Sequence, residues 1–264
     1  MPSVSEDGVA ISTRIARKPD GGDFSSTSER SPFHRHIFVG GNTLIPAILR
    51  DNAEQLRPQA SAAAFDAIIA RTTDQLTTRT ASISVETPTR DEDLLQIPVV
   101  VENLAGHKLP SGYPSRRAWV EVVVRDAANA VVFHSGGTDA QGRIVDDSGD
   151  PLSSESVGED VQPHRDEITE ASHVQIYETI MGDAEGTPVY RLLRAVTDAK
   201  DNRLLPRGWS DQSPYMDRIA PVLGGSDANF VGGSDRITYR VSAPAESGPY
   251  DVEVRLNYPS ISAR

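Results

Sequence analysis

Residues 95–104, Leu-Gln-Ile-Pro-Val-Val-Val-Glu-Asn-Leu, and residues 118–126, Ala-Trp-Val-Glu-Val-Val-Val-Arg-Asp, decide the fold of this chain. Both runs are rich in valine, and apolar and polar positions alternate along them, which is typical of β-strands. A third run, residues 130–135, follows the second after the short turn Ala127-Ala-Asn129-Ala. These segments predict a sheet built from short strands that tight turns connect.

Strand-like segments recur on both sides of this stretch. They lie at residues 81–86, 174–181, 189–196, 236–243 and 250–258. Seven or eight strands with turn residues between them predict an antiparallel sandwich of the immunoglobulin or fibronectin type. Ahead of the strands the apolar period becomes helical, over residues 44–52 and then 59–80. The predicted fold is therefore mainly β, a sandwich preceded by a short α-helical segment.

Three regions follow from this pattern. Residues 1–32 are polar and rich in Ser, Gly and Asp, and we interpret them as an extended lead-in. Residues 33–80 form the helical segment, and residues 81–264 form the sandwich. The sandwich carries two long loops, at 136–172 and 198–235. Long loops in a compact domain are usually functional or docked on a partner.

Composition excludes several classes of protein. The 264 residues carry a net charge of −12, which repels nucleic acid and favours basic partners such as a lysine-rich cytochrome, although solubility alone also explains it. The chain has no cysteine, so disulfides, thiol catalysis and covalent c-type haem are all excluded within it. No apolar stretch approaches the roughly 20 residues of a membrane span. The N-terminus shows no signal peptide.

The link between the first two strands has an unusual composition. It reads Asn103-Leu-Ala-Gly-His-Lys-Leu-Pro-Ser-Gly-Tyr-Pro-Ser-Arg-Arg-Ala-Trp119. Proline fixes φ and glycine permits positive φ, so this composition predicts a rigid loop. Such a loop aims His107 at a ligand, or uses the imidazole to pin itself to the sandwich. We expect Trp119, at the start of the next strand, to be buried.

The loop resembles a segment in the C-terminal domain of a class of multihaem c-type cytochromes. Further segments resemble that domain in the same order, namely His36–Asn42, Val174–Glu178, Lys200–Gly208, Asp227–Phe230 and Leu256–Ile261. The resemblance implies a sandwich that is a non-catalytic domain of an electron-transfer protein and that docks on or shields haems carried by an upstream region. It also implies a periplasmic or extracellular location. That family attaches its haems through Cys-x-x-Cys-His motifs, which this chain lacks, so any haem c must be supplied from outside the chain.

Five residues are candidates for contact with such a haem. The resemblance places His36 in a segment that packs against the haem region and supplies a ligand, and His164 at a matching family position. His107 is the candidate that its stiff loop indicates. Arg116 and Arg117 have the planar fork that binds propionates, but ion pairs with the sandwich's own acids explain them at least as well.

Other chemistries find less support. Asp139, Asp146, Asp147 and Asp150 crowd one loop, but their spacing departs from an EF-hand, so a solvated acidic loop is favoured over a calcium site. We find no Gly-x-Ser-x-Gly elbow, no Walker loop and no His-Glu-x-x-His motif, and the sequence therefore nominates no enzyme. The Lys200–Pro206 segment is interpreted as a structured turn that braces a loop, with contact to a partner as the second choice. The alternative function is a haem-free extracellular module that binds a protein or a glycan.

Overall fold

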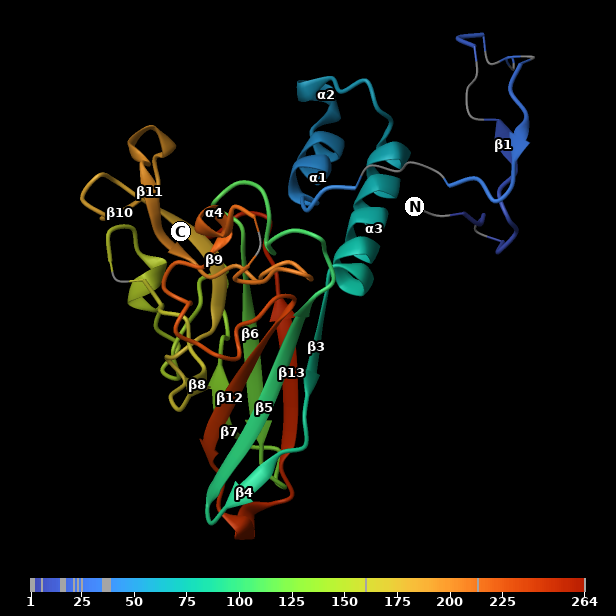
Figure 1. Cartoon of the computed structure of the whole chain (residues 1–264). Helices are drawn as coiled ribbons and strands as arrows, with labels where there is room; N and C mark the ends of the chain where they lie inside the picture. Colours follow the sequence, from blue (N-terminus) through green and yellow to red (C-terminus); the bar gives the residue numbers. More distant parts are fainter. Residues whose placement is uncertain are drawn as a thin grey trace. The chain divides into compact units, whose positions relative to one another are not determined.

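The computed structural model describes residues 3–5, 7–14, 18–20, 22, 24, 26–34, 39–159, 161–212 and 214–263. The chain forms two compact units, Met1–Gly40 and Gly41–Arg264. In the first unit, β1 (Thr13–Arg14) pairs antiparallel with β2 (Glu29–Arg30). The second unit holds the helices, the two large sheets and the candidate site, and its architecture is mainly β, which confirms the predicted fold class (Figure 1).

The first large sheet is centred on β6 (Arg117–Arg125). One edge of β6 pairs with β13 (Asp251–Asn257), and the other pairs with β7 (Val131–Ser135) and β9 (Ile176–Gly182). Two further strands pair with β9, namely β10 (Pro188–Val189) and β11 (Thr197–Asp201). All of these pairings are antiparallel.

The second large sheet is centred on β5 (Leu94–Asn103). Its neighbours on β5 are antiparallel and comprise β12 (Ser234–Ser242), β3 (Ala81–Val85) and β4 (Thr89–Asp91). The short strand β8 (Glu167–Ile168) pairs parallel to β12. Figure 1 shows the β5–β12 layer lying against the β6–β13 layer, as in a sandwich.

Alternate residues of β5 and β6 form the core between the sheets. Val99 and Val101 from β5 and Val120 and Val122 from β6 are completely buried. Burial of such a side chain contributes about 1.5–3 kcal/mol, so this alternation fixes the register of both strands. Trp119 is buried as predicted, and its indole Nε1 donates a hydrogen bond to the carbonyl oxygen of Gly136 at 2.8 Å.

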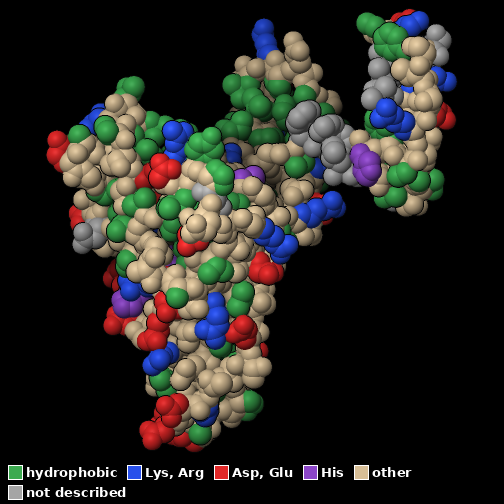
Figure 2. All heavy atoms as spheres, viewed as in Figure 1, with side chains coloured by type: hydrophobic (Ala, Val, Ile, Leu, Met, Phe, Trp, Pro, Cys, Tyr) green, Lys and Arg blue, Asp and Glu red, His purple; other side chains and the backbone are tan. Residues whose placement is uncertain are grey.

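Three helices precede the sandwich, α1 (Leu44–Asp51), α2 (Ala53–Leu56) and α3 (Ala62–Arg79). Ser61 caps α3, because its side chain accepts a hydrogen bond from the amide of Ala64. The predicted apolar stripe of this helix is only half-buried, and Leu44, Ile45 and Ile48 of α1 are exposed. Figure 2 shows hydrophobic side chains gathered over this part of the second unit. No helix of the described ranges combines the length and the apolar character that a bilayer span requires.

Two loop regions differ from the sequence-based prediction. The predicted strand 189–196 forms β10 and then a 3-10 turn at Leu192–Arg194, because Leu192 and Leu193 face solvent and have no sheet to cover. The predicted loop 198–235 instead begins within β11 and later holds the short helix α4 (Met216–Ile219). Two further 3-10 turns lie at Ser153–Glu155 and Ala245–Ser247.

Four hairpin turns share one construction, in which an aspartate Oδ1 accepts the backbone amides two and four residues further on. These aspartates are Asp126, Asp139, Asp146 and Asp183. The residue three positions after each has a positive φ, and it is glycine in three turns and Asn129 in the fourth. In the acidic loop, the Oδ1 atoms of Asp139 and Asp146 are therefore already occupied as acceptors of nearby backbone amides.

Candidate functional site

His107 lies exposed at the tip of the turn that follows β5. Its Nδ1 lies 2.9 Å from the carbonyl oxygen of Lys108. A carbonyl oxygen can only accept, so Nδ1 carries the proton and donates it, and the neutral ring then keeps an unprotonated Nε2. No described residue bonds this Nε2. The ring therefore presents a lone pair to whatever approaches the turn.

The buried side chain of Asn103 holds this turn in shape. Its Nδ2 donates to the carbonyl oxygens of His107 at 2.8 Å, Leu205 at 3.1 Å and Leu204 at 3.3 Å. Its Oδ1 accepts the amide of Ala105 at 2.9 Å. One side chain thus ties the two ends of the His107 turn to the 204–205 segment, which lies about a hundred residues away in the sequence.

The two motifs that the sequence singled out therefore lie against each other. Leu109 and Leu204 exchange backbone hydrogen bonds of 3.0 and 2.8 Å. The Lys108 ammonium donates to Asp201 at 2.7 Å, and both side chains are over nine-tenths buried. Burial pushes the pKa of Asp201 upward, but Arg203 and Lys108 outweigh it and hold that pKa below its ordinary value. The segment braces the loop, as predicted.

The two candidate arginines have different surroundings. Arg117 is 1% exposed, and its fork makes a two-pronged ion pair with Glu155 at 2.5 and 2.7 Å while its guanidinium lies over the Trp119 ring. Arg116 is half-buried and donates to the carbonyl oxygen of Ser111 at 2.9 Å. It lies over Gly112, whose φ is +89°, and a Cβ on that glycine would meet the guanidinium at 2.8 Å. Both arginines therefore bond within the chain.

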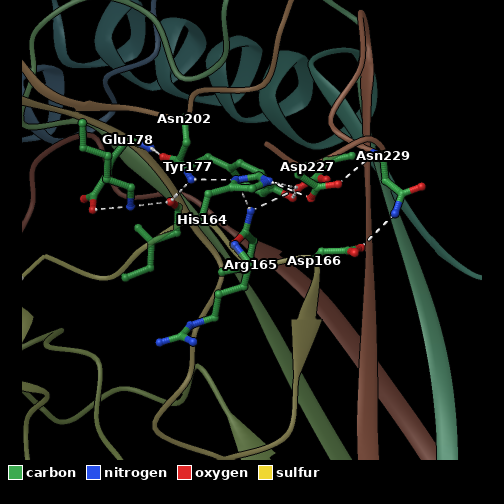
Figure 3. Close-up of polar contacts among 12 residues, drawn as sticks. His164, Arg165, Asp166, Tyr177, Glu178, Asn202, Asp227 and Asn229 are labelled. Atoms are coloured by element: carbon green, nitrogen blue, oxygen red, sulfur yellow. Dashed lines mark hydrogen bonds and ion pairs between the residues drawn. The ribbon is translucent and has the colours of Figure 1, made fainter. Parts of the chain in front are cut away.

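The remaining candidate histidines are His36 and His164. His36 lies outside the described residues. His164 lies at the centre of a buried polar network, which Figure 3 shows. Its Nε2 lies 3.1 Å from Asp227 Oδ2, and the two side chains are 2% and 6% exposed. Its Nδ1 accepts from Gln175 Nε2 at 2.8 Å and from Asn202 Nδ2 at 3.1 Å.

The amide orientations in this network fix the tautomer of His164. Gln175 Oε1 accepts the backbone amide of Arg165 at 2.9 Å, and Asn202 Oδ1 accepts that of Glu178 at 3.1 Å. The amide nitrogens must therefore face His164, whose Nδ1 is an acceptor and whose Nε2 carries the proton. This is the opposite tautomer to that of His107.

Asp235, from β12, completes the network. Its Oδ2 accepts from the Tyr177 hydroxyl at 2.7 Å and from Gln175 at 3.1 Å, and it lies 3.7 Å from His164 Nε2. The side chain is completely buried, and this burial, with the nearby Asp227 carboxylate, raises its pKa to about 7 despite the two hydrogen bonds. Burial lowers the pKa of His164, which Asp227 opposes.

The trio His164, Asp227 and Asp235 has donor atoms within 4.8 Å of one another, as a metal site requires. A metal ion would need the lone pair of Nε2, and the proton would then have to move to Nδ1. Two amide donors already face Nδ1, so that move would set N–H against N–H. The side chains do not fit a metal, and their burial leaves a substrate no access. The chemistry that the trio can perform is the holding of protons.

This network gathers segments that the sequence showed separately. Three of the segments that resemble the cytochrome domain contribute to it, namely Val174–Glu178 with Gln175 and Tyr177, Lys200–Gly208 with Asn202, and Asp227–Phe230 with Asp227. Each of these side chains bonds either His164 or Asp235. Sequence reasoning did not predict the burial of Asp235, because an aspartate at the start of a strand carries no local signal of burial. Recurrent polar residues inside otherwise apolar segments were the signal that could have identified the others.

No family model and no curated protein matches this chain. Among solved structures it is similar to a penta-heme cytochrome c552 from Thermochromatium tepidum, with 14% sequence identity and a TM-score of 0.42. The match covers 71% of this chain and 34% of that one, so the chain spans about a third of that protein's length. A TM-score at this level does not establish a shared fold.

Proposed function

We propose that the chain is a non-catalytic domain of an electron-transfer protein of the multihaem cytochrome type, and that its His107 turn faces a haem held by another region or by a partner. The observation that carries this proposal is the Nε2 of His107, to which no residue of the described ranges bonds. The resemblance of the loop and of the Lys200–Gly208 segment adds the class of protein. A periplasmic or extracellular location belongs to the same proposal.

The geometry of His107 suits an iron ligand. Histidines that bind metals typically donate the other ring N–H to a carbonyl or a carboxylate, which orients the ring and raises the basicity of the ligating nitrogen. The bond from Nδ1 to the Lys108 carbonyl has that form. A haem brings redox chemistry, which an axial histidine tunes. Because the chain has no cysteine, it cannot attach a c-type haem covalently, and the haem must come from another region or a partner. The part of this chain is to supply the ligand and the groups that hold it.

The surroundings of the turn suit contact with an apolar partner. A groove of about 700 Å³ lies between α3, β3 and β13. Its apolar lining includes Leu104 and Leu109, which flank the His107 turn, as well as Ile83 and Leu256. Burial of this lining against a haem-bearing region would add stability to the complex, because apolar area removed from water contributes about 25 cal/mol per Å².

Arg116 and Arg117 have a supporting part in this proposal. Arg117 holds Glu155 in the interior, and Arg116 closes the Gly112 turn. A propionate could reach the half-buried Arg116 more readily than the buried Arg117, whose two terminal nitrogens already bond Glu155. We therefore assign propionate contact, if a haem docks here, to Arg116.

The test uses a haem c peptide that carries one histidine on its iron and an open sixth position. Titration of the intact chain into this peptide should convert the iron to the low-spin spectrum of two nitrogen ligands. Half-conversion should need at least about tenfold less chain than free imidazole, because the ligand is pre-oriented. His107→Ala should abolish this advantage. His134→Ala is the matched control, since His134 is also on the surface but its Nε2 bonds Glu121 at 3.0 Å.

Two results would contradict the proposal. The first is a chain that performs no better than free imidazole, which would mean that no site is built around His107. The second is an equal loss in the His107 and His134 variants, which would mean that surface histidines ligate without selection.

A second candidate function is a haem-free binding module, and one surface favours it. Leu193 is fully exposed, Val196 is largely exposed and Leu192 is partly exposed, all on the loop between β10 and β11. An exposed apolar loop often marks a protein contact. A chain that fails the haem-peptide test but binds a protein through this loop would support this candidate instead.

A further inference from the structure

We propose that His164, Asp227 and Asp235 form a buried proton-binding site, in which Asp235 holds one carboxylic-acid proton at neutral pH and the state of that proton is transmitted to the His107 turn. This inference goes beyond the proposed function. It concerns protons that the chain binds by itself, and it stands whether or not a haem docks at His107.

The first step is the charge that the site can tolerate. The three side chains are 2%, 6% and 0% exposed, so water cannot screen them. Asp227 accepts the His164 Nε2 proton and the amide of Asn229 at 2.7 Å, which suits an ionised carboxylate. A second buried carboxylate beside it would lie in an environment where like charges repel strongly. Asp235 is therefore the group that retains a proton.

The second step is that His164 cannot take this proton. Protonation of the ring would place a hydrogen on Nδ1, where the Gln175 and Asn202 amides already donate. The site would lose both hydrogen bonds and gain a clash between donors. Burial favours the uncharged form of both groups. It raises the pKa of Asp235, whose neutral form is the protonated acid, and lowers that of His164, whose neutral form is the unprotonated ring. The folded chain thus keeps the proton on the acid and the imidazole neutral, the reverse of the usual order.

The groups that face the site support this assignment. They comprise His164 and Asp166 from the 161–166 segment, Tyr177 from β9, Lys200 from β11, Asp227 from the 224–230 loop, and Tyr239 and Arg236 from β12. The charge of the buried Lys200 acts on His164, and its ammonium is bonded to Glu178 at 3.0 Å. The groups that donate to Asp235 are the Tyr177 hydroxyl, the Gln175 amide and the backbone amide of Arg236, and all three are uncharged. A proton is the remaining means of neutralising it.

The third step is the route to the His107 turn. Asn202 bonds His164 Nδ1, and its neighbour Asp201 holds the Lys108 ammonium next to His107. Any shift of the imidazole on loss of the Asp235 proton therefore moves a residue that is covalently continuous with the brace of the turn. Lys200 and Asn202 both donate to the carbonyl oxygen of Ile176, and this shared acceptor restrains the two ends of the 200–202 segment relative to each other.

The test measures the proton and its transmission separately. Infrared spectra of the full chain between about pH 5.5 and about pH 8.5 should show a protonated carboxylic-acid band that titrates near neutrality. Asp235→Asn should remove this band, whereas Glu54→Gln, on exposed α2, should leave it unchanged. The amide resonances of Asn202, Lys108 and His107 should titrate with the same midpoint in the wild type and not in Asp235→Asn.

Each part of the proposal has its own refutation. Absence of the band, or its survival in Asp235→Asn, overturns the proton site. A band that titrates while the Lys108 and His107 resonances stay fixed overturns the transmission. If Asp235→Asn does not fold, Asp227→Asn serves in its place. Removal of that neighbouring charge should move the midpoint about half a pH unit or more downward, and an unchanged midpoint would refute the site. All of these outcomes are independent of the haem-peptide titration.

Discussion

Substitution of Asn103 by alanine tests how the His107 turn is held. The side chain makes four hydrogen bonds. Two of its partners keep a second donor, since Leu204 oxygen also accepts the Leu109 amide at 3.0 Å and Leu205 oxygen also accepts the Gly233 amide at 3.2 Å. The other two, the His107 carbonyl and the Ala105 amide, would lose the partner that holds them.

The expected cost follows from this division. A polar group left without a partner costs about 1–3 kcal/mol, and a lost bond whose acceptor keeps another costs about 0.5–1 kcal/mol. The orphaned groups lie near the surface and can reach water, so the lower values apply. We expect Asn103→Ala to reduce the free energy of unfolding by about 3–4 kcal/mol, measured by urea denaturation at constant slope.

Two comparison variants sharpen the result. Asn257→Ala is the matched control, because the Asn257 amide makes one bond, to Glu121 at 3.0 Å, and should cost under about 1 kcal/mol. Asn103→Asp should cost more than alanine near neutral pH, since it sets a carboxylate against three carbonyl oxygens, and this excess should shrink as the acid is protonated. A loss below about 1 kcal/mol for Asn103→Ala, or an equal loss for Asn257→Ala, would refute the reasoning.

Two other predictions concern buried charge. Glu155→Gln leaves the Arg117 guanidinium buried without its counter-ion and should cost about 3–5 kcal/mol in urea denaturation, and a loss under about 1 kcal/mol would show that water reaches the pair. The pKa of Asp201 is depressed in the folded state, so its contribution to stability is present above the unfolded value of about 3.9 and is lost as pH falls through the folded value. Urea titrations at about pH 7 and about pH 3 should therefore show a smaller acid loss in Asp201→Asn than in the wild type, and identical losses would contradict the ion-pair account.

The sequence could predict the strands of the core but not all of the loops. Val99 and Val101 in β5 and Val120 and Val122 in β6 alternate as buried strand residues must, so local pattern and tertiary packing agree there. The segment from Val189 to Val196 was also predicted as a strand, yet its Leu193 is fully exposed. Periodicity shows which side chains could be covered, and only the assembled sheets show whether anything covers them.

The parts of the candidate site that depend on local composition were predictable, and the parts that depend on distant contacts were not. The composition of the His107 loop pointed to a constrained turn, and the structure adds the carbonyl that sets its tautomer. The sequence favoured a turn at Lys200 and Asp201, because Asp and Asn side chains readily bond nearby backbone amides. Instead the two residues lie buried at the end of β11, where Lys200 pairs with Glu178 and Asp201 pairs with Lys108. Charge pairing of this kind joins residues far apart in the sequence, and no local rule shows it.

The measurement that tests the central claim most directly is the tautomeric state of His107 and His164 by nitrogen-15 correlation spectroscopy of the imidazole rings in slightly basic solution. The account predicts a proton on Nδ1 and an unprotonated Nε2 for His107, and a proton on Nε2 with an unprotonated Nδ1 for His164. A His107 ring protonated on Nε2 would contradict it, because the turn would then offer no lone pair to an iron.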